Sequence, residues 1–353
     1  GREVKFARIA FATAAIPIIL YSAASAQVSG CDICHAKSDF KRVLKSGRIQ
    51  SLYVDQAMID ASVHTGKQCI DCHVDIAEIP HTTKPQPVNC GQCHYEGNTV
   101  GAPQRNIKQE YDESVHAQAL LGGNTEAPTC QECHGSHQIL SHEDPASRTA
   151  KMNIPRTCGK CHLEVFAQYQ TSIHGVVLGK GNEDTPTCAD CHSEHGVRSH
   201  EDPQSPIYAT NVAQTCSHCH AAEGIVGKYG ISSGQVDTYD DSFHGVAMRF
   251  GMRTVANCAS CHGIHDIRAD DDPASSVHVD NIPETCGKCH PGANANYAIG
   301  KIHIEAQNPD AGIVYFVASF FKWLTISTVC ALILHIVLDL SRQIRNRRRD
   351  ANH

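Results

Sequence analysis

The longest apolar runs of the 353-residue chain lie near its two ends. The first extends from Ile9 to Leu20 and the second from Ile313 to Leu340. Between them, glycine, proline and asparagine recur, and these residues favour turns and loops. We therefore expect a mostly α-helical chain in which short helices alternate with long loops, with little or no sheet.

The first apolar run has the features of a secretory signal peptide. It follows three basic residues, Arg2, Lys5 and Arg8. It is followed by Ala24-Ser25-Ala26, a small-residue cleavage site, so residues 1–26 are predicted to be removed before Gln27. A retained membrane anchor is the alternative. Val28 to Cys31 also resembles a lipoprotein cleavage box, but it lies too far from the apolar run to be favoured.

The second apolar run predicts a transmembrane helix over residues 313–341. At about 1.5 Å per residue it is long enough to cross a bilayer, whose core is about 30 Å thick. Lys322 beside Trp323 fits an interfacial position. Residues 342–353 form a basic tail containing Arg342, Arg345, Arg347, Arg348 and Arg349. Because positive residues favour the cytoplasmic side, we expect a cytoplasmic tail and a periplasmic location for the region between the two apolar segments.

The composition is unusual for a globular protein of this length. There are 19 cysteines and 24 histidines, whereas aromatic residues make up only 6%. A conventional core would contain more aromatic side chains and far fewer cysteines. The net charge is -7 with neutral histidines, so the composition gives no indication of nucleic-acid binding.

Eighteen of the 19 cysteines form nine C-x-x-C-H motifs. This motif attaches c-type haem, because its two thiols bond to the haem vinyl groups and its histidine reaches the iron. Zinc sites and disulfide scaffolds do not require a histidine after every cysteine pair. The cofactor prediction is therefore nine c-type haems. The predicted attachment cysteines are Cys31, Cys34, Cys69, Cys72, Cys90, Cys93, Cys130, Cys133, Cys158, Cys161, Cys188, Cys191, Cys216, Cys219, Cys258, Cys261, Cys286 and Cys289. The predicted proximal iron ligands are His35, His73, His94, His134, His162, His192, His220, His262 and His290.

The motifs also repeat along the chain, which predicts a haem-cored protein made of two-haem modules. A Ser-x-His sequence precedes each module, and a C-x-x-C-H-x-x-H sequence is followed by a second C-x-x-C-H. The predicted boundaries are a three-haem module at 27–108 and two-haem modules at 109–167, 168–237 and 238–306. His303 marks a final half-repeat.

The repeats supply candidates for the second ligand of each iron. The Ser-x-His series and its half-repeat contribute His64, His116, His174, His244 and His303. The C-x-x-C-H-x-x-H series contributes His137, His195 and His265. The first module has Ile76 at the corresponding position, and His81 is the substitute candidate. Nine candidates for nine irons predict bis-histidine coordination throughout, which gives low reduction potentials.

These motifs resemble the multihaem class III-type c cytochromes over residues 31–303. The C-terminal segment FFKWLTISTVCALILHIVLDLSR is similar to anchors of multihaem subunits that work beside a quinone-reactive cytochrome b. The resemblance implies electron exchange between the membrane quinone pool and periplasmic redox proteins in anaerobic respiration. Since only one membrane helix follows the haem motifs, a separate membrane partner is also implied.

The leading hypothesis is an electron-transfer subunit of an oxidoreductase complex, with no catalytic side chains. One alternative is a multihaem reductase of nitrite, hydroxylamine or a sulfur oxyanion, which needs one five-coordinate iron. The haem at Cys31 is the suspect, because it lies outside the repeats, and the assignment of His81 as a distal ligand is the second open point. The other alternative is a subunit of a cytochrome filament.

Overall fold

The structure, a computed structural model, describes residues 30–44, 46–297 and 303–351. The predicted signal peptide at 1–26 lies outside these described residues. The chain divides into two compact units. The first comprises Gly1–Asp60 and His64–Val88, and the second comprises Ala61–Val63 and Asn89–His353.

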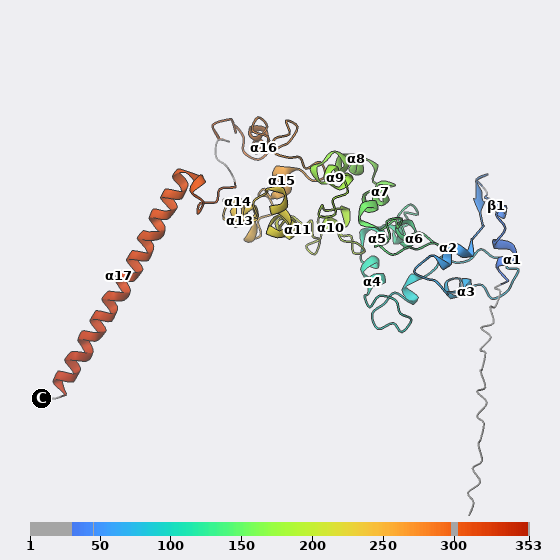
Figure 1. The fold of residues 1–353 in the computed structure, drawn as a ribbon, viewed down its shortest axis with the longest axis horizontal. Helices are drawn as coiled ribbons and strands as arrows, with labels where there is room; N and C mark the ends of the chain where they lie inside the picture. Colours follow the sequence, from blue (N-terminus) through green and yellow to red (C-terminus); the bar gives the residue numbers. More distant parts are fainter. Residues whose placement is uncertain (1–29, 45, 298–302, 352–353) are drawn as a thin grey trace, which may run out of the picture. The chain divides into compact units, whose positions relative to one another are not determined.

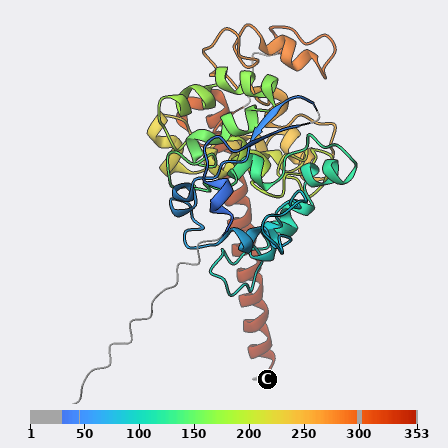
Figure 2. The ribbon, with the colours of Figure 1, turned by 90° about the vertical axis from the view of Figure 1, so that its right-hand side faces the viewer.

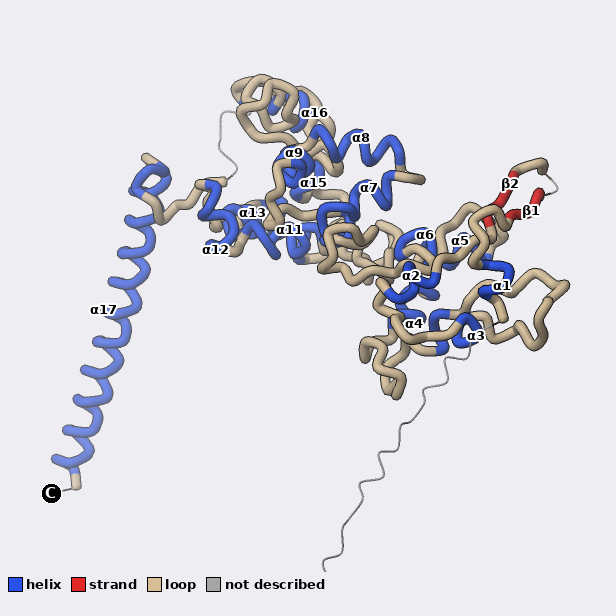
Figure 3. The backbone as a smooth tube through the Cα atoms, turned by 45° about the vertical axis from the view of Figure 1, so that its right-hand side comes forward, coloured by secondary structure: helices blue, strands red, loops and turns tan. Residues whose placement is uncertain are grey.

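The first unit contains short helices and a small sheet. Its elements are α1 (Asp32–His35), β1 (Lys41–Val43), β2 (Ile49–Ser51), α2 (Gln56–Asp60) and α3 (Cys69–Cys72). The two strands, red in Figure 3, pair in antiparallel register with Arg42 opposite Gln50. They form a two-stranded sheet, so the prediction of a mostly helical chain with little sheet is confirmed.

The second unit contains short helical segments joined by loops (Figures 1 and 2). Its first elements are η1 (Cys90–Gln92), α4 (Ile107–Asp112), α5 (Val115–Leu121), α6 (Cys130–His134), η2 (Lys151–Asn153), α7 (Ile154–Gly159), α8 (Leu163–Thr171), α9 (Ile173–Gly179) and α10 (Cys188–His192). They are followed by α11 (Val212–His220), α12 (Glu223–Val226), η3 (Gly227–Tyr229), α13 (Gln235–Asp240), α14 (Phe243–Arg249), α15 (Cys258–His262), α16 (Ile282–Gly287), η5 (Pro309–Ala311) and α17 (Ile313–Asp350).

Side-chain packing gives the described residues only a small apolar core. The buried apolar residues are Ala117, Ala150, Leu178, Val226, Tyr239, Ala247 and Met248. The most deeply buried side chains are four serines, Ser114, Ser172, Ser205 and Ser275. Their burial shows that hydrogen bonds, repeated from module to module, organise much of the fold.

The serine of each later Ser-x-His sequence caps a helix. Ser114, Ser172 and Ser242 are the N-cap residues of α5, α9 and α14. Each hydroxyl accepts a hydrogen bond from the backbone amide three residues later, at 3.0–3.2 Å. The cap satisfies a free amide at the helix start. The helix therefore begins just before the histidine, which explains the Ser-x-His spacing.

A tyrosine and an asparagine make the same hydrogen bonds in each of the three later sequence repeats. The hydroxyls of Tyr111, Tyr169 and Tyr239 donate to backbone carbonyls 17 residues later, at 2.7–3.0 Å. The side-chain amides of Asn153, Asn211 and Asn281 donate to a proline carbonyl and a serine carbonyl in the preceding loop. Both sets recur in all three modules, so the internal repeat of the sequence is also a repeat of hydrogen bonds.

Successive repeats are tied together by one backbone bond at each junction. The donor is the backbone amide of the residue between the serine and the histidine of a Ser-x-His sequence. The acceptor is a backbone carbonyl in the following repeat, two residues after the last histidine of its C-x-x-C-H-x-x-H sequence. The three bonds are Val63 to Ile139, Val115 to Val197 and Ile173 to Ile267, at 2.7–2.8 Å. Each bond joins the start of one Ser-x-His segment to the loop that follows the histidine of the next repeat.

The helix α17 is the exception to the short elements, with 38 residues (Figure 1). Of the described helices it alone is long and apolar enough to cross a membrane, and its most apolar window has a mean hydropathy of 2.0. Thr325 and Thr328 donate their hydroxyls to carbonyls four residues earlier, so these polar groups are satisfied within the helix.

Candidate haem-binding sites

Short helices place the two thiols and the histidine of a motif together. In α6, α10 and α15 the first cysteine begins the helix and the histidine ends it. Residues i, i+3 and i+4 of a helix share one face, so all three ligating groups point to the same side. Each of these helices also has a capping box, formed for example by Thr129 and Glu132.

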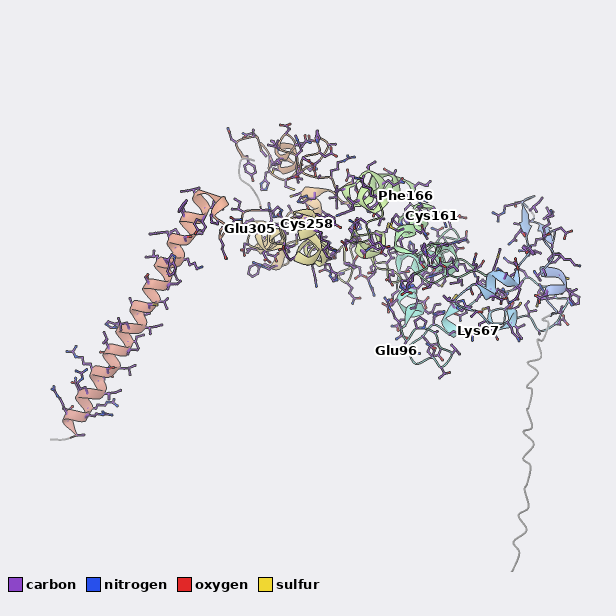
Figure 4. The ribbon with its side chains drawn as sticks, in the orientation of Figure 1. Lys67, Glu96, Cys161, Phe166, Cys258 and Glu305 are labelled. Atoms are coloured by element: carbon purple, nitrogen blue, oxygen red, sulfur yellow. The ribbon has the colours of Figure 1, made fainter. Side chains whose placement is uncertain are left out.

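The described cysteines form no disulfide. Among the described residues, we find no group of three or more His, Cys, Asp or Glu side chains arranged to hold a metal ion. Instead, the first cysteines of consecutive motifs lie close together, as Cys158 does with Cys188. Cys90 with Cys130 and Cys216 with Cys258 (the latter labelled in Figure 4) repeat this contact. The arrangement brings consecutive motifs together.

Fourteen of the predicted ligands form seven histidine pairs. The ring centroids are 5.9–6.3 Å apart in His35–His81, His116–His162, His134–His195, His174–His220, His192–His265, His244–His290 and His262–His303. Two imidazoles bound through nitrogen to one metal, at about 2.0 Å each, have centroids about 6 Å apart. The spacing and the donor atoms therefore fit the two axial positions of a haem iron.

The pairs follow a rule that the local sequence patterns do not reveal. The histidine of the second motif in a module pairs with the Ser-x-His histidine of the same module, as His162 does with His116. The histidine of the first motif pairs with one from the following repeat, as His134 does with His195. His303 of the half-repeat completes the series by pairing with His262.

The two kinds of pair also differ in the angle between their rings. The three pairs that join neighbouring repeats have interplanar angles of 6°, 20° and 32°. The three pairs within a module have angles of 42°, 57° and 46°. The two kinds of iron site would therefore have different axial ligand geometries.

The pair in the first unit joins His35 with His81, the least regular candidate of the sequence. Their rings are inclined by only 3°. Nδ1 of His35 lies 2.7 Å from the carbonyl oxygen of Leu52, and Nδ1 of His81 lies 2.9 Å from that of Thr83. Each carbonyl fixes a ring through Nδ1 and leaves Nε2 for a metal.

His64, His73, His94 and His137 each make an interaction in the structure. Their roles as iron ligands stay predictions, as do those of the other histidines and the attachment roles of the cysteines.

Burial keeps many of the paired imidazoles neutral. The pKa of His174 is lowered to about 4, first by burial and then by the nearby His220. Burial is also the main cause of the lowered pKa of His116, His134, His192, His195, His220, His244, His262, His265 and His303. A neutral imidazole has the free lone pair that a metal requires.

Sequence reasoning missed the residues that surround these imidazoles. Thr238 on α13 lies 2.9 Å from Nδ1 of His303 through its hydroxyl. Glu305, labelled in Figure 4, accepts a hydrogen bond from Ser232, which holds the His303 segment beside the same helix. In the sequence, Thr238 is marked only by its position directly before the recurring tyrosine.

Comparison with known proteins agrees with this geometry. The family model "Cytochrome c7 and related cytochrome c" matches residues 21–95. The high-molecular-weight cytochrome c of Nitratidesulfovibrio vulgaris is 23% identical over 327 residues, covering 74% of this chain and 56% of the relative. The chain is a multihaem cytochrome c. Its cofactors are c-type haems, and this class of protein points to electron transfer.

Two further relatives are known as multihaem cytochromes. MtrA of Shewanella baltica is 26% identical to this cytochrome over 196 residues, covering 54% of the chain and 52% of the relative. MtrC of the same organism is 29% identical over 133 residues, covering 36% of the chain and 17% of the relative. The cytochrome thus spans about half the length of the first two relatives. No solved structure gives a significant match.

Proposed function

We propose that the cytochrome carries nine bis-histidine c-type haems and passes electrons between a quinone-linked membrane partner and periplasmic redox proteins. The observation that carries this proposal is the set of seven histidine pairs at 5.9–6.3 Å. When bound, the haems would supply one-electron chemistry at low potential. The side chains would attach the haems, fix their axial geometry and tune their potentials.

His64, His73, His94 and His137 would supply the remaining axial ligands, as their sequence motifs predict. All nine irons would then be six-coordinate.

The pair formed by His35 and His81 argues against a reductase site at the first haem. A reductase needs an open distal position on iron, whereas the two rings are nearly parallel and both are fixed by backbone carbonyls. Six-coordinate irons suit electron transfer, because their ligands do not change during reaction. The cytochrome would therefore act as a subunit of an oxidoreductase complex.

The proposed location is the periplasmic face of the cytoplasmic membrane, with α17 as a single-pass anchor. Trp323 is exposed on α17 and fits an interfacial position, and the arginines at its end fit the cytoplasmic side. Asp339 accepts a hydrogen bond from Gln343 at 2.7 Å, close to this basic end. The proposed partner is a separate quinone-reactive subunit such as a cytochrome b.

The proposal is tested by counting haems and probing their coordination in the purified, detergent-solubilised protein. We expect nine haems per chain by pyridine haemochrome and no spectral change when carbon monoxide is added to the reduced protein. A lower haem count would contradict the attachment sites. A carbon monoxide shift equivalent to one haem would contradict full six-coordination and favour the reductase alternative.

A further inference from the structure

A charged cluster surrounds the distal imidazole of one predicted haem site. The site is that of His134 and His195, whose rings are parallel within 6°. Nδ1 of His195 is buried and has no hydrogen-bond partner. It lies 3.8 Å from a carboxylate oxygen of Glu194 and 4.0 Å from one of Glu110. The nitrogen opposite the metal position therefore faces two carboxylates.

Arg105 holds these two carboxylates in place. Its guanidinium donates to both oxygens of Glu110 at 2.9 Å and to Glu194 at 3.2 Å. The cluster has two negative charges and one positive charge, so its net charge beside His195 is negative. Glu110 is the better shielded of the two carboxylates, with 33% of its side chain exposed against 61% for Glu194. Its charge is therefore less screened by water.

The equivalent positions in the other modules are uncharged. Glu110 directly precedes the recurring Tyr111, and the residues before Tyr169 and Tyr239 are Gln168 and Thr238. At the third site the hydroxyl of Thr238 bonds Nδ1 of His303. One position of the repeat thus places a carboxylate beside one distal imidazole and a hydroxyl beside another.

We propose that Glu110, positioned by Arg105, gives the haem of His134 and His195 a lower potential than the haem of His262 and His303, where Thr238 takes the place of Glu110. A negative charge beside Nδ1 makes the imidazole a stronger donor and favours the more positive, oxidised iron. Glu110 is therefore a positioning and tuning residue rather than an iron ligand. The inference rests on the proposed haem ligation.

The test is a spectroelectrochemical titration of the full haem-loaded protein. Glu110→Gln keeps the side-chain shape and removes the charge, so the midpoint of one haem should rise while the others stay unchanged. Arg105→Gln keeps both carboxylates and removes the positive charge, so the same midpoint should fall. Structural damage would move both variants in the same direction, which makes the opposite signs diagnostic.

Glu113→Gln is the matched control. Glu113 follows α4 immediately, but its carboxylate bonds Arg198 at 2.6 Å instead of facing an imidazole. The control should leave the midpoint of the His134–His195 haem unchanged. Glu110→Thr, which copies the Thr238 site, should raise it as Glu110→Gln does.

Unchanged midpoints in both Glu110→Gln and Arg105→Gln, or shifts of the same sign, would overturn the inference. If Glu110→Gln lost haem, Arg105→Gln would still test the inference through the direction in which its midpoint shifts. A wild-type protein without haem at Cys130 and Cys133, shown by peptide mass analysis, would instead overturn the proposed function on which the inference rests.

Discussion

At the scale of single residues, the histidines proposed as axial ligands differ in how their rings are held. His35 and His81 are both fixed by backbone carbonyls, whereas His303 is fixed by the hydroxyl of Thr238. A backbone carbonyl is kept when the side chain of its residue is substituted. The ligands proposed for the first haem are therefore held independently of the side chains of Leu52 and Thr83. His81 is therefore the informative residue to remove.

His81→Ala should leave one of the nine proposed haems without its distal ligand. We expect a high-spin component and a carbon monoxide shift equivalent to one haem, with the haem count unchanged because the thioether bonds do not involve His81. His142→Ala is the matched control, since His142 lies outside all the histidine motifs that supply the predicted ligands. An unaltered carbon monoxide response in His81→Ala would show that His81 does not bind this iron.

At the scale of the element, a buried serine cap links the fold to the site. Ser172 is 1% exposed, and its hydroxyl accepts from the amide of Gly175 and donates to the carbonyl of Tyr169. It fixes the start of α9 and so the position of His174. A Cβ on Gly175 would lie 2.0 Å from the carbonyl oxygen of Tyr169, which shows how closely α8 and α9 approach.

Ser172→Ala should destabilise the protein by about 1 kcal/mol, the usual cost of losing an N-cap. A lower urea midpoint with an unchanged slope would show it, followed through the low-spin haem absorbance. Thr171→Ala is the neighbouring control, because Thr171 is exposed and bonds only the carbonyl of Gln168. Equal midpoints for the two variants would rule out the capping role.

Part of this arrangement could be predicted from sequence and part could not. The motifs indicate the donor types, and the spacing of the repeats indicates the modules, because both follow from local chemistry. The partner of each histidine depends on how one repeat packs against the next, which no local pattern records. The role of Glu110 was equally hidden, because it requires Arg105, Glu194 and His195 from separate segments to meet.

At the scale of the whole molecule, two kinds of axial geometry alternate along the later modules. Pairs that join repeats are inclined by 6–32°, and pairs within a module by 42–57°. The angle between the imidazole planes sets the splitting of the iron d orbitals. The two kinds of site should therefore differ in magnetic anisotropy.

The oxidised protein should accordingly show two low-spin populations by electron paramagnetic resonance at low temperature. One should have the rhombic spectrum of nearly parallel imidazoles, and the other the more axial spectrum of steeply inclined rings. Glu113→Gln should leave both unchanged, whereas His81→Ala should reduce only the rhombic population. A single rhombic population in the wild-type protein would contradict the alternation.

Because histidines pair across repeats, further modules could be added to the cytochrome in a head-to-tail arrangement. Each module would complete the first iron of the module before it and leave its own first iron for the module after it. Such a heterologous contact is open-ended, as in a filament, and it needs a terminal cap. The half-repeat with His303 would act as that cap. A module could then be inserted or lost at a junction without leaving an iron short of its second axial ligand, provided that the cap is kept.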